Sequence, residues 1–456
     1  MEKNIIEKNS EEHENFQDNS FISNTSEILT NNNKENIHIV NKSNSNTLED
    51  NSNKENKIIL EKIVNSEKIQ RKDHSFSLLP ITQEQKRKRN FGIDIARILS
   101  IIFIINHHIL YHGGPLGQMK IHSFNSYLYL YFNTIFCSGV NIFGMISGFV
   151  GFNSHKYSNL MYLLLQTFIY NYLIAFYFKK TRPYVVNDLN LYLYPIFISD
   201  YWYFTSYFIM YFFLPLINKG IKNMTKKEMG IFNLSLFLFI SCFGQIKHYS
   251  SRLRIDLFIL NNGYCYVWLI ILYFFGSYFG RFNNKSHNYN KFLIALVCVF
   301  IILIATYFRN VLLIYKLEHY NSHDNMFVEY TCPSYVIISI CFIIMFSKLN
   351  VKSNISQKII SFFGPLTFGV YLLHNHVLVR NNIIARKYFW ILKYSSFKLL
   401  SVEMLESLKI FIICSFIDYI RFLLFKLLRI KQICIFISNL LSKISNGILF
   451  LFELLY

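Results

Sequence analysis

Beyond residue 90 the sequence is a succession of apolar runs, many of them near the length at which an α-helix crosses a lipid bilayer. A hydrocarbon core about 30 Å thick takes roughly 20 helical residues to span, and backbone exposed to lipid must satisfy its hydrogen bonds within the helix. Charged residues make up 16% of the chain, below the roughly 25% of soluble domains. We therefore expect an all-α integral membrane protein: a bundle of about ten transmembrane helices with a disordered N-terminal tail.

Ten ranges satisfy this criterion, with edges where polar residues return. The expected spans are 91–111, 124–150, 159–178, 202–218, 231–246, 265–280, 292–308, 332–347, 365–380 and 408–425. Together they make residues 89–431 a multi-pass membrane domain. The segment 432–456 is apolar as well, so we expect it to lie along the membrane interface or to enter the membrane as an extra helix.

Residues 1–88 have a different composition, rich in Asn, Ser, Glu and Lys. Such a segment buries too little apolar surface to offset the entropy of ordering, so we expect a disordered polar tail. The basic cluster QKRKRN at 85–90 directly precedes the first apolar run. Positive charge at that position predicts a cytosolic N-terminus. Alternation across ten spans then places both ends of the chain in the cytosol.

The net charge of +19 fits a membrane protein better than a nucleic-acid-binding one. The basic residues lie between apolar spans and not in one aromatic-laced patch, so the lipid bilayer is the expected partner and nucleic acid is not. The eight cysteines lie mostly within apolar runs and never form a CxxC pair. We expect them to be packing residues, with no metal site and no permanently bound cofactor.

Ionisable groups interrupt the first expected helix, and such groups are functional candidates because they are costly in hydrocarbon. Asp94 and Arg97 are three residues apart and can pair on one face. Alternatively, the pair only anchors the helix at the cytosolic boundary. His108 follows Arg97 after eleven residues, about 16 Å farther along the same face. A neutral imidazole there can accept a proton from a hydroxyl, or it can be a structural group bonded to a neighbouring helix.

The pattern IDIAR at 93–97, followed by His108, resembles the first helix of the acyltransferase-3 family of membrane acyltransferases. Five later segments are similar to further helices of that family, in the family's order. They are FGMISGFVG at 143–151, SDYWYFTSYFIMYFFLPLIN at 199–218, YCYVWLIILYFFGSYFGR at 264–281, FGVYLLHNHVLVR at 368–380 and SFIDYIRFLLFKLLRI at 415–430.

The resemblance implies a ten-helix bundle with a cytosolic N-terminus. It also implies transfer of acyl groups, mostly acetyl from acetyl-CoA, to hydroxyls of carbohydrate or glycolipid acceptors. One departure stands at the third helix, where many members carry an arginine pair and this chain reads YSNLMYLLLQTFIYNY from Tyr157. Lys156 is a weak substitute for those arginines.

We interpret His108 as the general base toward an acceptor hydroxyl and Arg97, beside Asp94, as a ligand for CoA phosphate. His374 matches the family's Tyr-Leu-X-His pattern. It is a candidate oxyanion or substrate donor, with a structural role as the alternative. His376, two residues on, points about 200° away if the helix continues.

Three residues of the 199–218 segment and one at the end of the 365–380 span complete the expected site. Trp202 and Tyr207 can stack on sugar rings, although aromatic residues also anchor helices at membrane interfaces. Thr205 and Tyr207 are further candidate oxyanion donors. Arg380, expected at the outer end of the ninth helix, holds an acceptor hydroxyl or extends its side chain to the interface.

Two other classes of protein remain open at this level. A multi-pass transporter or flippase could line its path with the same Arg and His, although no second copy of the Asp-Arg-His pattern indicates an internal repeat. A structural or receptor-like membrane protein would leave the buried charge without a purpose. Acyl transfer accounts for more of the pattern.

Overall fold

The computed structural model describes residues 89–118, 123–196, 201–245, 260–282, 290–319 and 328–455. Throughout this part of the chain the regular secondary structure is helical, without a strand, which confirms the predicted all-α class. The polar tail expected at 1–88 lies outside the described residues.

The helices follow one another in the order expected from the apolar runs. They are α2 (Phe91–Tyr111), α3 (Pro115–Gln118), α4 (Phe124–Gly151), α5 (Tyr157–Thr181), α6 (Trp202–Asn223), α7 (Lys226–Leu236), α8 (Tyr266–Phe282), α9 (Lys291–His319), α10 (Pro333–Ser347), α11 (Asn354–Phe363), α12 (Thr367–Asn375), α13 (Val377–Val379), α14 (Ser396–Leu427) and α15 (Ile430–Leu455).

Within the described residues, five helical segments are long and apolar enough to cross a membrane. They are Phe91–Gln118, Phe124–Gly151, Tyr157–Thr181, Lys226–Gln245 and Lys291–Tyr315. A sixth is reached if Asn354–Asn375 and Val377–Lys393, which meet at a bend of 57°, form one span. The protein is thus a multi-pass helical membrane protein by composition, and the count of about ten spans stays a prediction.

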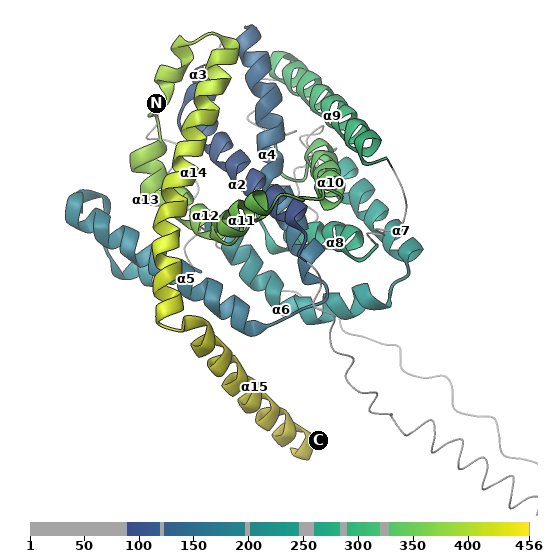
Figure 1. Cartoon of the computed structure of the whole chain (residues 1–456), viewed down its shortest axis with the longest axis vertical. Coiled ribbons are helices and arrows are strands. Elements are labelled where there is room, and N and C mark those ends of the chain that lie inside the picture. Colours follow the sequence, from purple (N-terminus) through teal and green to yellow (C-terminus); the bar gives the residue numbers. More distant parts are fainter. Residues whose placement is uncertain are drawn as a thin grey trace, which may run out of the picture. The chain divides into compact units, whose positions relative to one another are not determined.

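The helices α2 and α4 lie at the centre, with α14 alongside α2 and α8 against α4 (Figure 1). Small residues make the α4 and α8 pair close. A Cβ atom added to Gly276 would overlap the Met145 carbonyl oxygen, and one added to Gly280 would overlap that of Phe149. The FGMISGFVG segment therefore contributes close backbone contact, the usual role of small residues between membrane helices.

A buried ion pair joins α14 to α5. Arg421 donates to both oxygens of Asp418, at 2.9 and 2.8 Å, and Tyr170 of α5 donates to the same carboxylate at 2.7 Å. Gln166, one turn before Tyr170, adds a bond of 3.1 Å. Gly369 of α12 lies so close that a Cβ atom there would overlap the Asp418 carboxylate. The pair therefore fixes α14 against two other helices.

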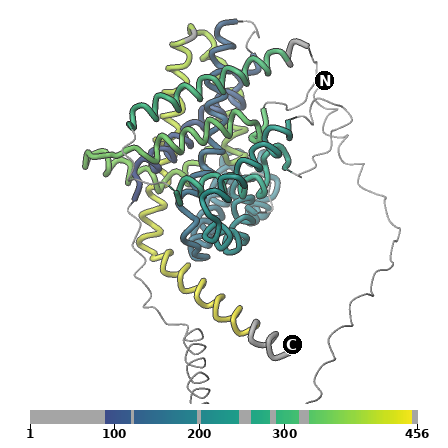
Figure 2. Tube along the Cα trace, turned by 90° about the vertical axis from the view of Figure 1, so that its right-hand side faces the viewer, coloured from purple at the N-terminus to yellow at the C-terminus, as the bar shows by residue number. Residues whose placement is uncertain are grey.

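The chain bends between α14 and α15 at Arg429, whose φ of 53° lies in the left-handed region. Figure 2 shows α15, in yellow, continuing beyond this bend, and its residues contact α5. The apolar segment expected at 432–456 is thus part of a helix that begins at Ile430. Whether that helix lies along the membrane or enters it stays a prediction.

Candidate active site

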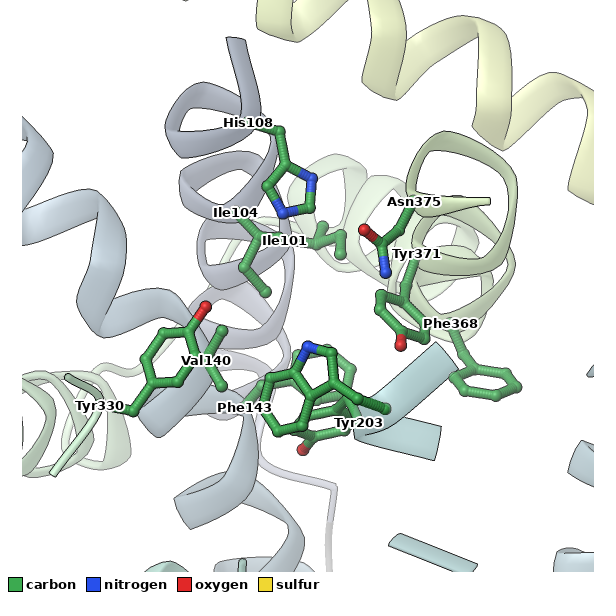
Figure 3. Close-up of a pocket in the computed structure, with 11 residues that line it drawn as sticks. Ile101, Ile104, His108, Val140, Phe143, Tyr203, Tyr330, Phe368, Tyr371 and Asn375 are labelled. Atoms are coloured by element: carbon green, nitrogen blue, oxygen red, sulfur yellow. The ribbon is translucent and has the colours of Figure 1, made fainter. Parts of the chain in front are cut away.

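One face of α2 carries the expected chemistry. Arg97, Ile101, Ile104 and His108 recur at intervals of three or four residues, which places them in one row along the helix. The last three line a cavity, drawn in Figure 3. Arg97 precedes them by one turn, so the cation and the imidazole stand at opposite ends of the row, and the helix rises about 16 Å between the two residues.

The cavity lies among α2, α4, α6, α12 and the segment that precedes α10. Its volume is about 30 Å³, room for one or two water molecules. The lining residues are Ile101, Ile104, His108, Val140, Phe143, Trp202, Tyr203, Tyr330, Phe368, Tyr371 and Asn375. Apolar and aromatic walls with a few polar groups are typical of a small-molecule site.

His108 and His374 bring two imidazoles together in the interior. Their ring centroids are 5.2 Å apart, and His374 is only 1% exposed. His374 Nδ1 lies 2.6 Å from the Val370 carbonyl oxygen. Because that oxygen only accepts, Nδ1 of His374 carries the proton. His374 Nε2 and His108 Nδ1 are buried without a hydrogen-bond partner in the described part of the chain.

This tautomer changes the role expected for His374. A neutral imidazole protonated at Nδ1 presents a lone pair at Nε2, so it accepts hydrogen bonds and cannot donate one to an oxyanion. The geometry instead suits His374 as an acceptor beside His108. The oxyanion donor has to be sought among other side chains of the cavity.

The ninth span is not the continuous helix that we expected. α12 ends at Asn375, and His376 has an extended backbone with φ −54° and ψ 132°. The His376 ring accepts a hydrogen bond of 3.1 Å from the Leu378 backbone N–H, which caps the next helix, α13. The expectation that His376 points 200° from His374 on one helix, with Arg380 closing it, is therefore wrong.

Arg380 begins a short π-helix, Arg380–Ile384, on the far side of this break. Its guanidinium lies 3.5 Å from the Asn375 side-chain oxygen, and Asn375 lines the cavity. Arg380 is thus connected to the site through Asn375. Direct binding of an acceptor hydroxyl by Arg380 remains a prediction.

Sequence reasoning missed Tyr371. This phenol lines the cavity, is 7% exposed, and has a buried hydroxyl with no hydrogen-bond partner among the described residues. Tyr371 and His374 are three residues apart on α12, so Tyr371 is the tyrosine of the Tyr-Leu-X-His pattern and could have been singled out from the sequence. The conformation of Tyr371 makes its hydroxyl an available donor inside the cavity.

The three α6 candidates separate in the structure. Trp202 lines the cavity and stacks on Tyr330, with ring centroids 5.6 Å apart. Thr205 does not line it, and its hydroxyl donates to the Ile196 carbonyl oxygen at 3.3 Å. Tyr207 lies farther along α6, where its ring centroid is 5.9 Å from that of Tyr211. Of the three, only Trp202 belongs to the cavity wall.

Where α2 begins, basic groups gather. Asp94 accepts from Arg89 at 2.6 Å and from Arg97 at 3.0 Å, so one carboxylate orients two guanidinium groups. In the turn between α4 and α5, Lys156 and His155 contact Tyr211 of α6. Partial burial lowers the pKa of His155 from its ordinary value, so this ring adds little positive charge at neutral pH.

Fold and site together define a helical membrane protein with an imidazole pair in its interior and two guanidinium groups, those of Arg89 and Arg97, near the start of α2. Residues 90–416 match the sequence model of the acyltransferase-3 family, which is described as an acyltransferase domain. The match covers more than half of the chain, so this protein belongs to the acyltransferase-3 family and is a membrane acyltransferase. No curated protein and no solved structure matches the chain.

Proposed function

We propose that this acyltransferase moves an acyl group, in the first place acetyl, from acyl-CoA to a hydroxyl of a carbohydrate or glycolipid, with His108 as the general base. The observation that carries the proposal is the row along α2 from Arg97 to His108, which ends in a cavity with aromatic walls. The separation of about 16 Å suits an extended pantetheine arm between a phosphate and a thioester.

The base would act on the acceptor hydroxyl. His108 reaches the cavity, and its ring takes the hydroxyl proton while the oxygen attacks the acyl carbonyl carbon. The negative charge that develops on the carbonyl oxygen is met by the Tyr371 hydroxyl, which is buried in the cavity wall. Direct transfer from CoA and transfer from an acyl-enzyme both fit this base.

Arg97 would bind phosphate of the donor. Its guanidinium offers several N–H groups, and the bond to Asp94 Oδ1 at 3.0 Å uses one nitrogen, so others remain for phosphate oxygens. Arg89 shares the same carboxylate and adds positive charge at this end of the helix.

Aromatic rings support a sugar as the acceptor. Trp202, Tyr203 and Tyr330 line the cavity, and flat aromatic faces with polar edges suit the apolar faces and hydroxyls of a sugar. Since the space of about 30 Å³ is too small for a sugar ring, binding of a sugar requires the cavity to widen.

The experiment uses the purified full-length protein in detergent with radiolabelled acetyl-CoA, and measures CoA release and transfer to a panel of sugar acceptors. His108→Ala should lower turnover about 100-fold to 10,000-fold. Arg97→Ala should mainly raise the KM for acetyl-CoA. His112→Ala is the comparison variant: its ring lies 5.3 Å from that of His108 but outside the cavity-lining set, so it should lower turnover far less than His108→Ala. Wild-type turnover in His108→Ala would refute the general-base assignment.

A further inference from the structure

Two basic segments that are far apart in the sequence meet in the fold. The last turn of α5 and the residue after it carry three cations, Lys179, Lys180 and Arg182. Phe178 of the same turn packs with Leu378 of α13 in one apolar cluster, and Arg182 Nη1 lies 3.5 Å from the Asn382 carbonyl oxygen. The end of α5 and the segment around Arg380 therefore form one surface with a concentration of positive charge.

Arg380 connects this surface to the cavity. Its Nη1 atom is 3.5 Å from the Asn375 side-chain oxygen, and Asn375 lines the cavity, across from His108 in Figure 3. A bond of this length to a neutral amide is weak, and a guanidinium has five N–H donors. Arg380 can therefore bind a charged partner at the cavity without giving up a strong bond elsewhere.

Within the described residues, the four cations of this surface have no acidic partner. The ion pairs found there join Arg89 and Arg97 to Asp94, Lys409 to Glu406, and Arg421 to Asp418. Asp188 lies in the loop after α5, but its exposed carboxylate accepts from the Asn190 backbone N–H. Positive charge without a counter-ion beside a cavity attracts an anionic ligand.

The position of this surface separates it from the expected donor site. The Arg386 backbone N–H donates to the His112 carbonyl oxygen at 3.0 Å, so the segment that contains Arg380 packs on the end of α2 opposite Arg97. By the predicted alternation from a cytosolic N-terminus, both basic segments lie on the other side of the membrane, where Lys and Arg are normally scarce. Because the donor phosphates are assigned to Arg97, this charge is left for the acceptor.

We propose that the acceptor is an anionic carbohydrate, which carries a carboxylate or a phosphate group, and that Arg380 binds this group. His108 then takes the proton from a hydroxyl of the same molecule, and Arg182 adds positive charge at the entrance. A guanidinium binds a carboxylate or a phosphate through paired hydrogen bonds, which a neutral sugar does not offer. This inference rests on the proposed function, because it takes a carbohydrate as the acceptor.

Matched acceptors test the proposal. The full-length protein in detergent is assayed with radiolabelled acetyl-CoA and with glucose, galactose and mannose, each supplied as the neutral methyl glycoside, the uronic acid and the sugar 1-phosphate. We expect kcat/KM for an anionic acceptor to exceed that for its neutral counterpart at least about 10-fold. Arg380→Gln should reduce this preference about 10-fold to 100-fold by raising the KM for the anionic acceptor, without raising the KM for acetyl-CoA.

Two further variants separate charge recognition from a structural role. Arg380→Lys keeps the charge without the planar fork, so it should retain part of the preference, and it replaces Arg380→Gln if that variant does not fold. Lys398→Gln removes a cation whose ammonium group lies over the Tyr394 ring, and it should leave the preference unchanged. An equal loss on neutral and anionic acceptors in Arg380→Gln, or a raised KM for acetyl-CoA, would overturn the inference.

The remaining outcomes distinguish this inference from the proposed function. A wild type that acetylates neutral sugars as well as their anionic counterparts would overturn the anionic acceptor and leave the proposed function standing. Transfer to no carbohydrate would overturn both. If Arg380→Gln instead abolishes a stimulation by added phosphatidylglycerol and leaves the acceptor preference intact, the surface binds lipid headgroups and the inference is wrong.

Discussion

We expect that removing one charge of the buried Asp418–Arg421 ion pair destabilises the fold more than removing both charges together. The Asp418 side chain is 0% exposed and that of Arg421 is 7% exposed. Arg421 makes two bonds to the carboxylate and a third, of 2.8 Å, to the Tyr162 hydroxyl. Tyr170 and Gln166 satisfy the rest of the carboxylate.

The magnitudes follow from what each change leaves buried. Arg421→Met leaves a carboxylate with neutral donors but no counter-charge, and Asp418→Asn leaves a guanidinium in the same position. Each should lower the free energy of unfolding by about 3–5 kcal/mol. The double variant leaves neither charge, and loses only bonds worth about 1–2 kcal/mol in total. The coupling between the two sites is therefore on the order of 5 kcal/mol.

Titration with SDS in mixed micelles, followed by circular dichroism, measures these free energies. Asn is chosen at 418 because Gly369 leaves no room for a larger side chain. Glu406 and Lys409 provide the matched control, since they form an i,i+3 pair on the same helix with Lys409 65% exposed. Lys409→Met should cost less than about 1 kcal/mol. A double variant that loses the sum of the two single effects would refute the reasoning.

Three further predictions concern function. Tyr371→Phe should lower turnover about 10-fold to 100-fold with little change in the KM for acetyl-CoA, because it removes an oxyanion donor; an unchanged turnover would exclude that role. Deletion of residues 1–80, which keeps QKRKRN, should leave membrane insertion and acyl transfer intact, as judged by labelled acetyl transfer. In sealed vesicles of known orientation, acetyl-CoA on the side of Arg97 should label an acceptor confined to the opposite side; failure to do so would place both substrates on one side.

Helix positions were predictable because the bilayer imposes a length and a polarity on each span. The range 91–111 coincides with α2, and the row from Arg97 to His108 follows from helical spacing alone. The prediction of a continuous helix for the ninth span was wrong for a local reason. Nothing in an apolar run shows that the His376 ring accepts a hydrogen bond from the Leu378 backbone N–H. The end of α12 at Asn375 and the position of Arg380 beyond it could therefore not be predicted from the sequence.

The partners of the site residues required the tertiary structure. The sequence marks a polar group as costly in hydrocarbon, but not which helix satisfies it. Tyr371 belongs to a recognised pattern, yet its unpartnered hydroxyl appears only when α12 packs against α2 and α6. Thr205 was expected to donate to the oxyanion, but its hydroxyl donates to the Ile196 carbonyl oxygen and does not line the cavity.

The cysteines show the same limit of sequence reasoning, because a residue expected only to pack can contact a polar side chain of another helix. Sulfur within an apolar run is normally a packing group, and that rule describes a side chain without regard to its neighbours. Cys137 departs from it because α2 and α4 align two residues that are thirty positions apart, His107 and Cys137. A cysteine next to an imidazole is a different chemical group from one next to isoleucine. Polar contacts between two membrane helices therefore cannot be read from residue type, because they depend on which helix faces meet.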